Sequence, residues 1–150
     1  SGGIRASMEE GEVTMGQVIS VLPFQNTLAT FQAKGQTVVD ALENGVSQVE
    51  DVKGRFLQVA GLSFTWDSSV APNEGRVTEV LVGGEPIDLD ATYGIVTNNF
   101  VRNGGDGFKM FVSEAMNAYD FGPDLADVLA EYMAAQGPVS PAVEGRITKK

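Results

Sequence analysis

The chain has 150 residues, the size of a single domain. It contains no cysteine and no histidine, which excludes disulfides, thiolate nucleophiles and an imidazole general base within these residues. Its 20 acidic residues outnumber 10 basic ones, for a net charge of −10; duplex nucleic acid and an anionic membrane surface are therefore poor partners, and no apolar run is long enough to insert into a membrane.

The first predicted helix follows Thr14. Thr14 and Gln17 have the spacing of a capping box, in which each residue satisfies a free backbone N–H of the first helical turn. The helix must end before Pro23, because a proline disfavours helical geometry in the residue before it. A strand is then predicted over residues 26–33, closed by a turn at Lys34 and Gly35.

A second helix is expected to start with Thr37 as its N-cap. Its apolar residues recur at helical spacing and form one stripe: Val38, Leu42, Val46 and Val49. Residues 55–66 follow as the most strand-like stretch, apolar on both faces. A strand of that kind usually lies between two layers of structure.

A hairpin is predicted where residues 77–82 and 85–87 flank a Gly-Gly turn. Pro86 would keep the second arm at a sheet edge, because proline cannot donate to a ladder of hydrogen bonds. Residues 93–97 are predicted to form another short strand.

Two more helices complete the expected chain. One is placed around residues 108–116, after a glycine-rich segment. The other runs from Pro123, as its first helical residue, to Gly137 just past its end. Helix and strand signals that alternate along the chain, with a hairpin among them, predict mixed α and β layers and the α+β class.

The glycine-rich segment 103–107 is the first candidate for a binding site. Consecutive glycines permit positive φ angles and a close approach of backbone to a ligand. Asp106 within it could accept hydrogen bonds from that ligand. The alternative is a tight loop in which Asp106 caps the next helix, and residue types alone leave both open. The segment matches neither a P-loop nor a dinucleotide-binding fingerprint.

Three further side chains have two interpretations each. Arg5 follows two glycines and is either an ordinary surface charge or an anion ligand. Phe24 and Phe100 would normally be assigned to the core. An aromatic ring in a loop beside amide side chains can instead hold a planar ligand.

Five blocks in order carry a resemblance to a known family. They are GGIR at 2–5, VLPFQN at 21–26, GRFLQVAG at 54–61, NFVRNGGDGF at 99–108 and PAVEGRI at 141–147. Together they resemble the C-terminal domain of the 5′-nucleotidase family, which includes UDP-sugar hydrolases. The resemblance covers residues 2–147, nearly the whole chain.

The resemblance implies a layered α/β/β/α sandwich over residues 1–150. It also implies a preceding metallophosphoesterase domain that carries two divalent metal ions, so this chain would bind no cofactor and would be inactive alone. Its partners would be that domain and a nucleoside or nucleotide, including UDP-sugars, in a periplasmic or extracellular enzyme that hydrolyses phosphate esters.

The resemblance assigns six substrate-binding positions: Arg5, Phe24, Asn26, Gly54, Phe100 and Asp106. Phe24 and Phe100 resemble two aromatics that enclose the base. Arg5 resembles an arginine that contacts anionic oxygens of the substrate near the domain cleft. Asn26 and Asp106 match positions near the base and ribose, and the glycine brings backbone close to the base. The family has an asparagine just before the first block, and the chain begins after that position.

Two alternatives accompany this interpretation. The first is a stand-alone binding or dimerisation module without a catalytic role, since some family members form a homodimer through this domain. The second is a sulfur-oxidation relative with a different substrate, against which the presence of both Phe24 and Phe100 argues. Metal-binding motifs upstream of the chain would decide between an enzyme and a module.

Overall fold

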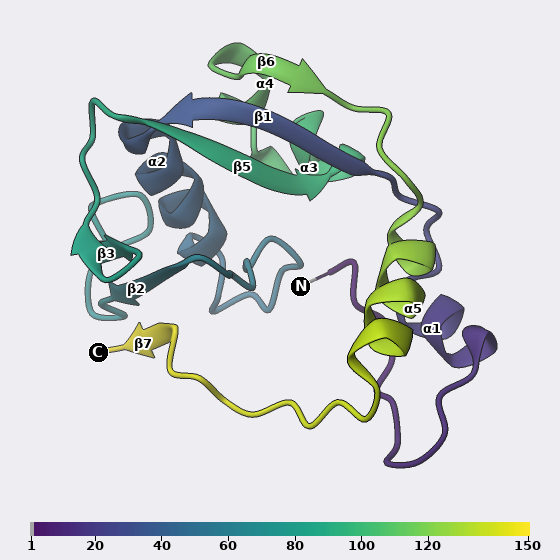
Figure 1. Cartoon of the computed structure of the whole chain (residues 1–150). Helices are drawn as coiled ribbons and strands as arrows, with labels where there is room; N and C mark the ends of the chain where they lie inside the picture. Colours follow the sequence, from purple (N-terminus) through teal and green to yellow (C-terminus); the bar gives the residue numbers. More distant parts are fainter. Residues whose placement is uncertain (1) are drawn as a thin grey trace.

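The computed structural model describes residues 2–150, which form two β-sheets (Figure 1). The three-stranded sheet has the order β5-β1-β6, and the four-stranded sheet has the order β4-β3-β2-β7. Neighbouring strands are antiparallel except for β2 and β7, which are parallel. The strands are β1 (Leu28–Lys34), β2 (Leu62–Trp66), β3 (Val77–Val82), β4 (Glu85–Pro86), β5 (Thr92–Asn98), β6 (Met116–Tyr119) and β7 (Ile147–Lys149).

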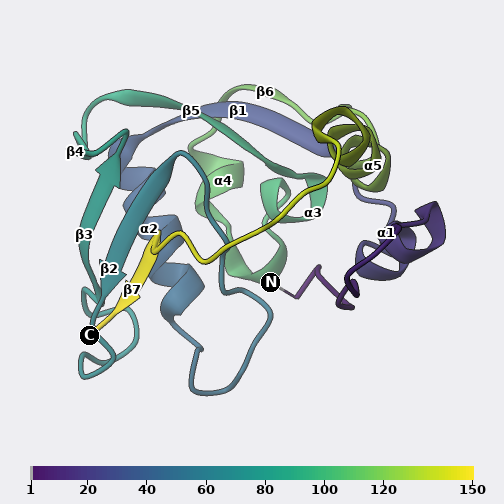
Figure 2. The ribbon, with the colours of Figure 1, turned by 60° about the horizontal axis from the view of Figure 1, so that its bottom comes forward.

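The longest helices occupy two different places. α2 (Gly35–Val46) lies between the two sheets, whereas α5 (Leu125–Gln136) packs against α1 (Met15–Val21) beyond the end of the three-stranded sheet (Figures 1 and 2). Short helical turns α3 (Asn99–Arg102), η1 (Gly105–Gly107) and α4 (Met110–Ser113) follow β5 in succession. The expected α+β class is confirmed.

The core is built on both sides of α2. One cluster joins this helix to the four-stranded sheet: Val38, Leu42, Val46, Phe64, Trp66 and Val80. A second cluster joins it to the three-stranded sheet and the segment after β5: Phe31, Ala33, Ala41, Phe108 and Phe111. Burial of apolar surface stabilises by about 25 cal/mol per Å². Because α2 buries apolar side chains against each sheet, the helix stabilises the packing of both.

The predicted start of α1 is confirmed. The Gln17 amide donates to the Thr14 hydroxyl (3.4 Å), and the Thr14 amide donates to the Gln17 side-chain oxygen (2.8 Å). The helix ends at Val21, before Pro23. The predicted hairpin is also present, and Gly83 and Gly84 both have positive φ, as a tight hairpin turn requires.

The turn predicted at Lys34 and Gly35 is wrong, because β1 passes directly into α2. The first helical N–H groups need acceptors, and backbone carbonyls supply them. Gly35 donates to Ala91 (3.0 Å) and Gln36 donates to Leu89 (3.0 Å). These acceptors come from a loop more than fifty residues away, so local sequence could not reveal them.

Thr37 is not the N-cap either, since it lies inside the first turn of α2 and is 1% exposed. Its hydroxyl donates to the Glu114 carboxylate at 2.6 Å. A threonine before an apolar stripe is typical of a cap. Here its hydroxyl is used for a tertiary contact instead.

The strand predicted over residues 55–66 is too long, because only its last five residues form β2. Gly61 has a φ of 76° and precedes the strand. Leu57 and Val59 lie in irregular backbone and pack against the core around α2. The apolar residues that suggested a second strand face therefore cover the helix, and β2 itself buries one face only.

The helix predicted over residues 108–116 is too long, because only the single turn of α4 is helical. The last residue of the predicted range, Met116, is instead the first residue of β6. The C-terminal helix ends before Gly137 as predicted, where φ is 75°. It starts two residues later than expected, at Leu125, because Asp124 is its N-cap and Pro123 lies outside. The Asp124 carboxylate accepts from the amides of Ala126 and Asp127.

The C-terminal segment crosses from α5 to the four-stranded sheet, where β7 pairs with β2 (Figures 1 and 2). Phe64 donates to the Arg146 carbonyl (2.8 Å), and Lys150 donates to the Trp66 carbonyl (2.8 Å). The last block of the sequence thus completes this sheet.

Candidate functional site

A cavity of about 790 Å³ lies between three parts of the chain. These parts are the N-terminal segment, helix α5 and the residues that follow β5. Five of the six predicted site residues line it: Phe24, Asn26, Gly54, Phe100 and Asp106. Phe24 and Asn26 belong to the loop before β1, and Gly54 belongs to the coil that follows α2. Phe100 lies in α3 and Asp106 lies in η1. The fold thus brings together positions that are up to 82 residues apart in sequence, from Phe24 to Asp106.

The two aromatic rings of the cavity are only half buried. Phe24 is 56% exposed and Phe100 is 50% exposed. Full burial of a phenylalanine side chain stabilises by roughly 1.5–3 kcal/mol, so leaving two rings in water forgoes stabilisation that the core could have supplied. Neither residue belongs to the core, so the interpretation of the two rings as core side chains is wrong.

Phe100 rests on the glycine-rich loop that follows it. A Cβ atom on Gly105 would overlap the Phe100 ring. Only glycine allows the ring to lie this close to the loop backbone. The contact between the Phe100 ring and Gly105 therefore fixes the position of both the ring and the loop.

The second pair of close backbones lies at Gly2 and Gly54. The Gly2 amide donates to the Gly54 carbonyl (2.8 Å), and a Cβ on either glycine would stand 2.9 Å from the other's Cα. A Cβ on Gly54 would also lie 3.6 Å from the Asp106 carboxylate. These contacts place the N-terminal segment, the coil after α2 and Asp106 around one part of the cavity.

Asp106 is not a helix cap. It lies within η1 at a φ of 52°, and Gly104 and Gly107 on either side also have positive φ angles. Aspartate tolerates this region better than most residues. Its side chain is exposed and lines the cavity.

Arg5 lies beside the cavity and not in its lining. Its guanidinium carbon is 6.0 Å from the centre of the Phe24 ring, and Nη1 donates to the Gly2 carbonyl (3.2 Å). A guanidinium at this distance is attracted to the ring face. Arg5 is exposed, so it is available to an anion outside the cavity.

Asn26 contributes an amide to the lining. Its backbone carbonyl accepts from Leu125 (2.8 Å), which ties the loop to the start of α5. Within residues 2–150 the side-chain amide has no hydrogen-bond partner. A polar group of this kind can specify the orientation of a ligand.

Two residues near the cavity were missed from sequence. Arg55 lines the cavity, and its Nη1 donates to Asn44 Oδ1 (3.2 Å). Asn44 in turn donates from Nδ2 to the Asp106 carbonyl (3.2 Å). Arg55 directly follows Gly54, a predicted site residue, and the chain has only 10 basic residues. This position could have indicated Arg55 from sequence. Nothing local marked Asn44.

A smaller cavity of about 240 Å³ shares three lining residues with the first: Leu57, Gln58 and Thr97. The rest of its wall is mostly apolar and comes from α2, the coil before β2, β2, β3, β5 and α4. Ligand sites combine apolar walls with a few convergent polar groups. The larger cavity, which has Asn26 and Asp106, is therefore the better candidate.

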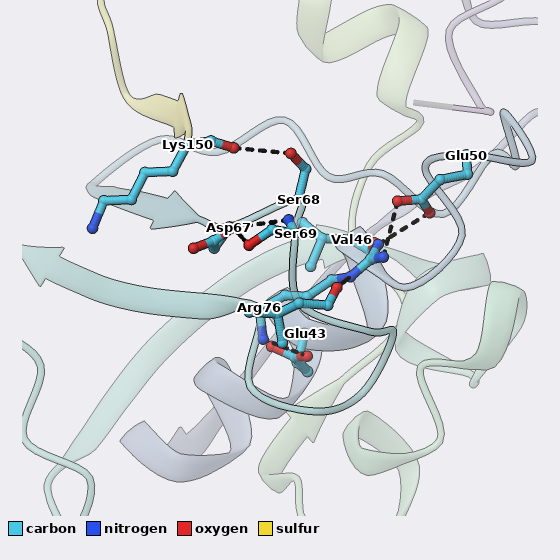
Figure 3. A network of polar contacts seen from close by, with 9 residues as sticks. Glu43, Val46, Glu50, Asp67, Ser68, Ser69, Arg76 and Lys150 are labelled. Carbon is cyan, nitrogen blue, oxygen red and sulfur yellow. Dashed lines mark hydrogen bonds and ion pairs between the residues drawn. The ribbon is translucent and has the colours of Figure 1, made fainter.

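A separate polar network holds the loop before β3 against the end of α2 (Figure 3). Arg76 is 3% exposed and donates to the carbonyls of Val70 (2.7 Å) and Val46 (2.8 Å). It also pairs with the Glu50 carboxylate at 2.9 Å. The Glu43 carboxylate accepts from the backbone amide of Arg76 (2.9 Å). None of these residues lines the larger cavity.

Two carboxyl groups of this region have perturbed acidity. The hydrogen bond from Arg76, and then a backbone hydrogen bond, lower the pKa of Glu50 below its ordinary value. Hydrogen bonds from the Ser69 hydroxyl and the Ser69 amide lower the pKa of Asp67. Both groups are therefore more acidic in the folded chain.

Residues 2–150 contain no group of three histidine, cysteine or carboxylate side chains placed to hold a metal ion. The two metal ions that the family implies therefore do not fit the residues of this domain. None of the helices in the same residues is long and apolar enough to cross a membrane.

Residues 1–113 match the family model of the 5′-nucleotidase C-terminal domain. The chain belongs to this family. It is 42% identical over 152 residues to the trifunctional nucleotide phosphoesterase YfkN of Bacillus subtilis, covering 97% of this chain and 10% of that protein. It is 35% identical over 157 residues to human 5′-nucleotidase, covering 97% of this chain and 27% of the relative.

A solved structure agrees with these sequence matches. The 5′-nucleotidase precursor of Thermus thermophilus superimposes with a TM-score of 0.95 at 45% identity, over 99% of this chain and 30% of that one. This 5′-nucleotidase family domain therefore spans less than a third of the length of each of these three proteins.

Proposed function

We propose that this chain is the substrate-recognition domain of a 5′-nucleotidase, which hydrolyses the phosphate esters of nucleotides. The domain binds the nucleoside part in the larger cavity. Hydrolysis belongs to an N-terminal metallophosphoesterase domain with two divalent metal ions. The domain boundaries are residues 1–150, and the enzyme is periplasmic or extracellular.

The observation that carries this proposal is the pair of half-exposed rings in one cavity. A base inserted at Phe24 and Phe100 would cover apolar surface that is otherwise wet. Stacking on an aromatic ring contributes roughly 1–3 kcal/mol per base in nucleic-acid complexes. The membership of the chain in a nucleotide-hydrolysing family supports a base as the planar ligand.

The polar residues take the remaining parts of the nucleotide. Asp106 accepts hydrogen bonds from ribose hydroxyls, and the Asn26 amide orients the base. The backbone at Gly54 lets the base approach closely. Arg5, outside the cavity and next to Phe24, faces the phosphate or another anionic group, which includes the diphosphate of a UDP-sugar.

The experiment is an NMR titration of the chain with adenosine. Because the phosphate contacts of the N-terminal domain are lacking, a dissociation constant near 1 mM is expected, or about −4 kcal/mol. Phe100→Ala should abolish detectable binding and change the melting temperature little, since the ring is half exposed.

Phe121→Ala is the matched control, because Phe121 is 83% exposed and does not line the cavity. It should bind adenosine like the wild type. A large loss of melting temperature in Phe100→Ala with unchanged adenosine binding would show that the ring supports the fold and not a ligand.

The alternative of a stand-alone binding or dimerisation module is less well supported. The relatives reported above carry names that describe phosphoesterases and 5′-nucleotidases. A homodimer through this domain is compatible with the enzyme role. Sedimentation of the chain with and without adenosine tests it separately.

A further inference from the structure

The direction of the Asp106 side chain depends on an unusual stretch of backbone. Asp106 has a φ of 52°, and both Gly104 and Gly107 also have positive φ. A residue other than glycine is uncommon in this region and persists there only when its surroundings hold it. Something must therefore fix the loop if Asp106 is to meet a ligand in one orientation.

Two side chains reach this loop from the direction of the core. Asn44, on α2, donates from Nδ2 to the Asp106 carbonyl (3.2 Å). Arg55 donates from Nη1 to Asn44 Oδ1 (3.2 Å) and to the Ser47 hydroxyl (3.4 Å). A Cβ on Gly107 would stand 3.0 Å from Asn44 Oδ1, so the loop lies directly against this pair.

The hydrogen bonds that lead to Asp106 begin on α2, a helix of the core. Residues of α2 are buried in both core clusters, and buried core elements open less readily than exposed loops. The charged donor on Arg55 polarises the Asn44 amide and strengthens its second hydrogen bond, as successive bonds do in networks. No ion pair joins Arg55 to Asp106 in residues 2–150, so the arginine acts through Asn44.

We propose that Asn44 and Arg55 are positioning residues that hold Asp106 in the orientation needed to bind ribose hydroxyls. This inference rests on the proposed function, since it assumes that Asp106 accepts from the sugar. It assigns to Arg55 a role in substrate selection that does not require contact with the substrate.

The test compares adenosine with 2′,3′-dideoxyadenosine, which lacks the hydroxyls but keeps the base. The wild-type chain should bind adenosine about tenfold more tightly, the size expected for a hydrogen bond to a charged acceptor. Affinities are measured by NMR titration, and melting temperatures are measured in parallel.

Asn44→Asp is the most informative variant. It keeps the shape and the acceptor for Arg55 but loses the donor to the Asp106 carbonyl. The preference for adenosine should fall to less than threefold, with dideoxyadenosine affinity unchanged. Arg55→Met should act in the same direction, and Arg55→Lys should restore part of the preference. Gln36→Ala, an exposed amide on the same helix, is the control.

The outcomes separate the two proposals. If the wild type shows no preference for adenosine, Asp106 does not bind the hydroxyls, and the proposed role of Asp106 fails together with this inference. If the wild type prefers adenosine and both Asn44→Asp and Arg55→Met keep that preference, the positioning role is overturned and the proposed function stands. Equal losses for both ligands would also overturn it, because they would indicate a merely structural role.

Discussion

A buried arginine must find acceptors for its donors, and Arg76 finds them on two separate segments. Replacement by alanine would leave the carbonyls of Val46 and Val70 without this donor. An unsatisfied buried polar group costs about 1–3 kcal/mol, so Arg76→Ala should lower the free energy of unfolding by about 2–4 kcal/mol. Urea denaturation measures this.

The ion pair itself should account for little of that loss, because the Glu50 side chain is 55% exposed and exposed pairs contribute about 0–1 kcal/mol. Glu50→Gln should therefore cost less than about 1 kcal/mol. Arg146→Ala breaks an exposed pair with Glu144 and is the control. An Arg76→Ala variant as stable as Arg146→Ala would contradict the importance of the two carbonyls.

The lowered pKa values of Glu50 and Asp67 make stability depend on pH. The folded-state pKa of each group lies below the ordinary values of 4.5 and 3.8, so the unfolded chain binds more protons in acid. Their contribution is complete above about pH 4.5 and is lost as the pH falls through the lowered values. The urea midpoint should therefore decrease between pH 5 and pH 3.

The double variant Glu50→Gln, Asp67→Asn should lose less stability over this pH interval than the wild type. Glu131→Gln on α5, which is exposed, should follow the wild-type curve. Identical curves for the wild type and the double variant would exclude these two groups as the source of the dependence.

At the scale of the elements, Gly35 shows how tertiary packing determines a helix start. A Cβ at this position would overlap the Asp88 carbonyl oxygen. Alanine favours helices over glycine by up to about 1 kcal/mol, but relief of the overlap requires the loop to move, at about 1–3 kcal/mol. Gly35→Ala should therefore be destabilising in thermal unfolding.

Gly16→Ala is the matched control, because Gly16 lies in α1 and its Cβ would come no closer than 3.8 Å to the Thr14 hydroxyl. This change should be neutral or stabilising by up to about 1 kcal/mol. If both variants gained stability, the contact between Gly35 and the Asp88 loop would not be limiting.

The same contrast explains which elements could be predicted from sequence. The capping box at Thr14 and the hairpin at Gly83 and Gly84 depend on neighbours in the chain, and both predictions are confirmed. The start of α2 and the role of Thr37 depend on residues from distant loops, and both predictions are wrong. Residues 55–61 look like a strand because they are apolar, yet they cover α2 as irregular backbone.

The candidate site follows a similar rule. Motif positions such as Phe24 and Phe100 could be named from the resemblance, and the fold places them in one cavity. Arg5 belongs to the same set of positions but lies just outside the lining. Asn44 could not be found, because its contact with Asp106 crosses 62 residues of sequence.

At the scale of the whole molecule, the described residues 2–150 form a ligand-sized cavity but no cluster of three metal-ligating side chains. Two-metal phosphoester hydrolysis needs two ions about 3.5–4 Å apart and ligands for both. Without histidine and cysteine, carboxylates would have to supply the charged ligands, and residues 2–150 hold no group of three acidic side chains suited to a metal ion. The net negative charge of the chain does not replace such a cluster, because carboxylates scattered over the surface do not hold two ions at a fixed separation.

We therefore expect the 150-residue chain to release no phosphate from AMP with Mg²⁺, Mn²⁺, Zn²⁺ or Co²⁺. The measurement is a phosphate-release assay at high protein concentration, and it needs a control for traces of a contaminating phosphatase. Phe100→Ala supplies that control, because this change would reduce an activity that uses the cavity and would leave a contaminant unaffected. Metal-dependent phosphate release that copurifies with the chain and falls in Phe100→Ala would show that the domain itself hydrolyses nucleotides.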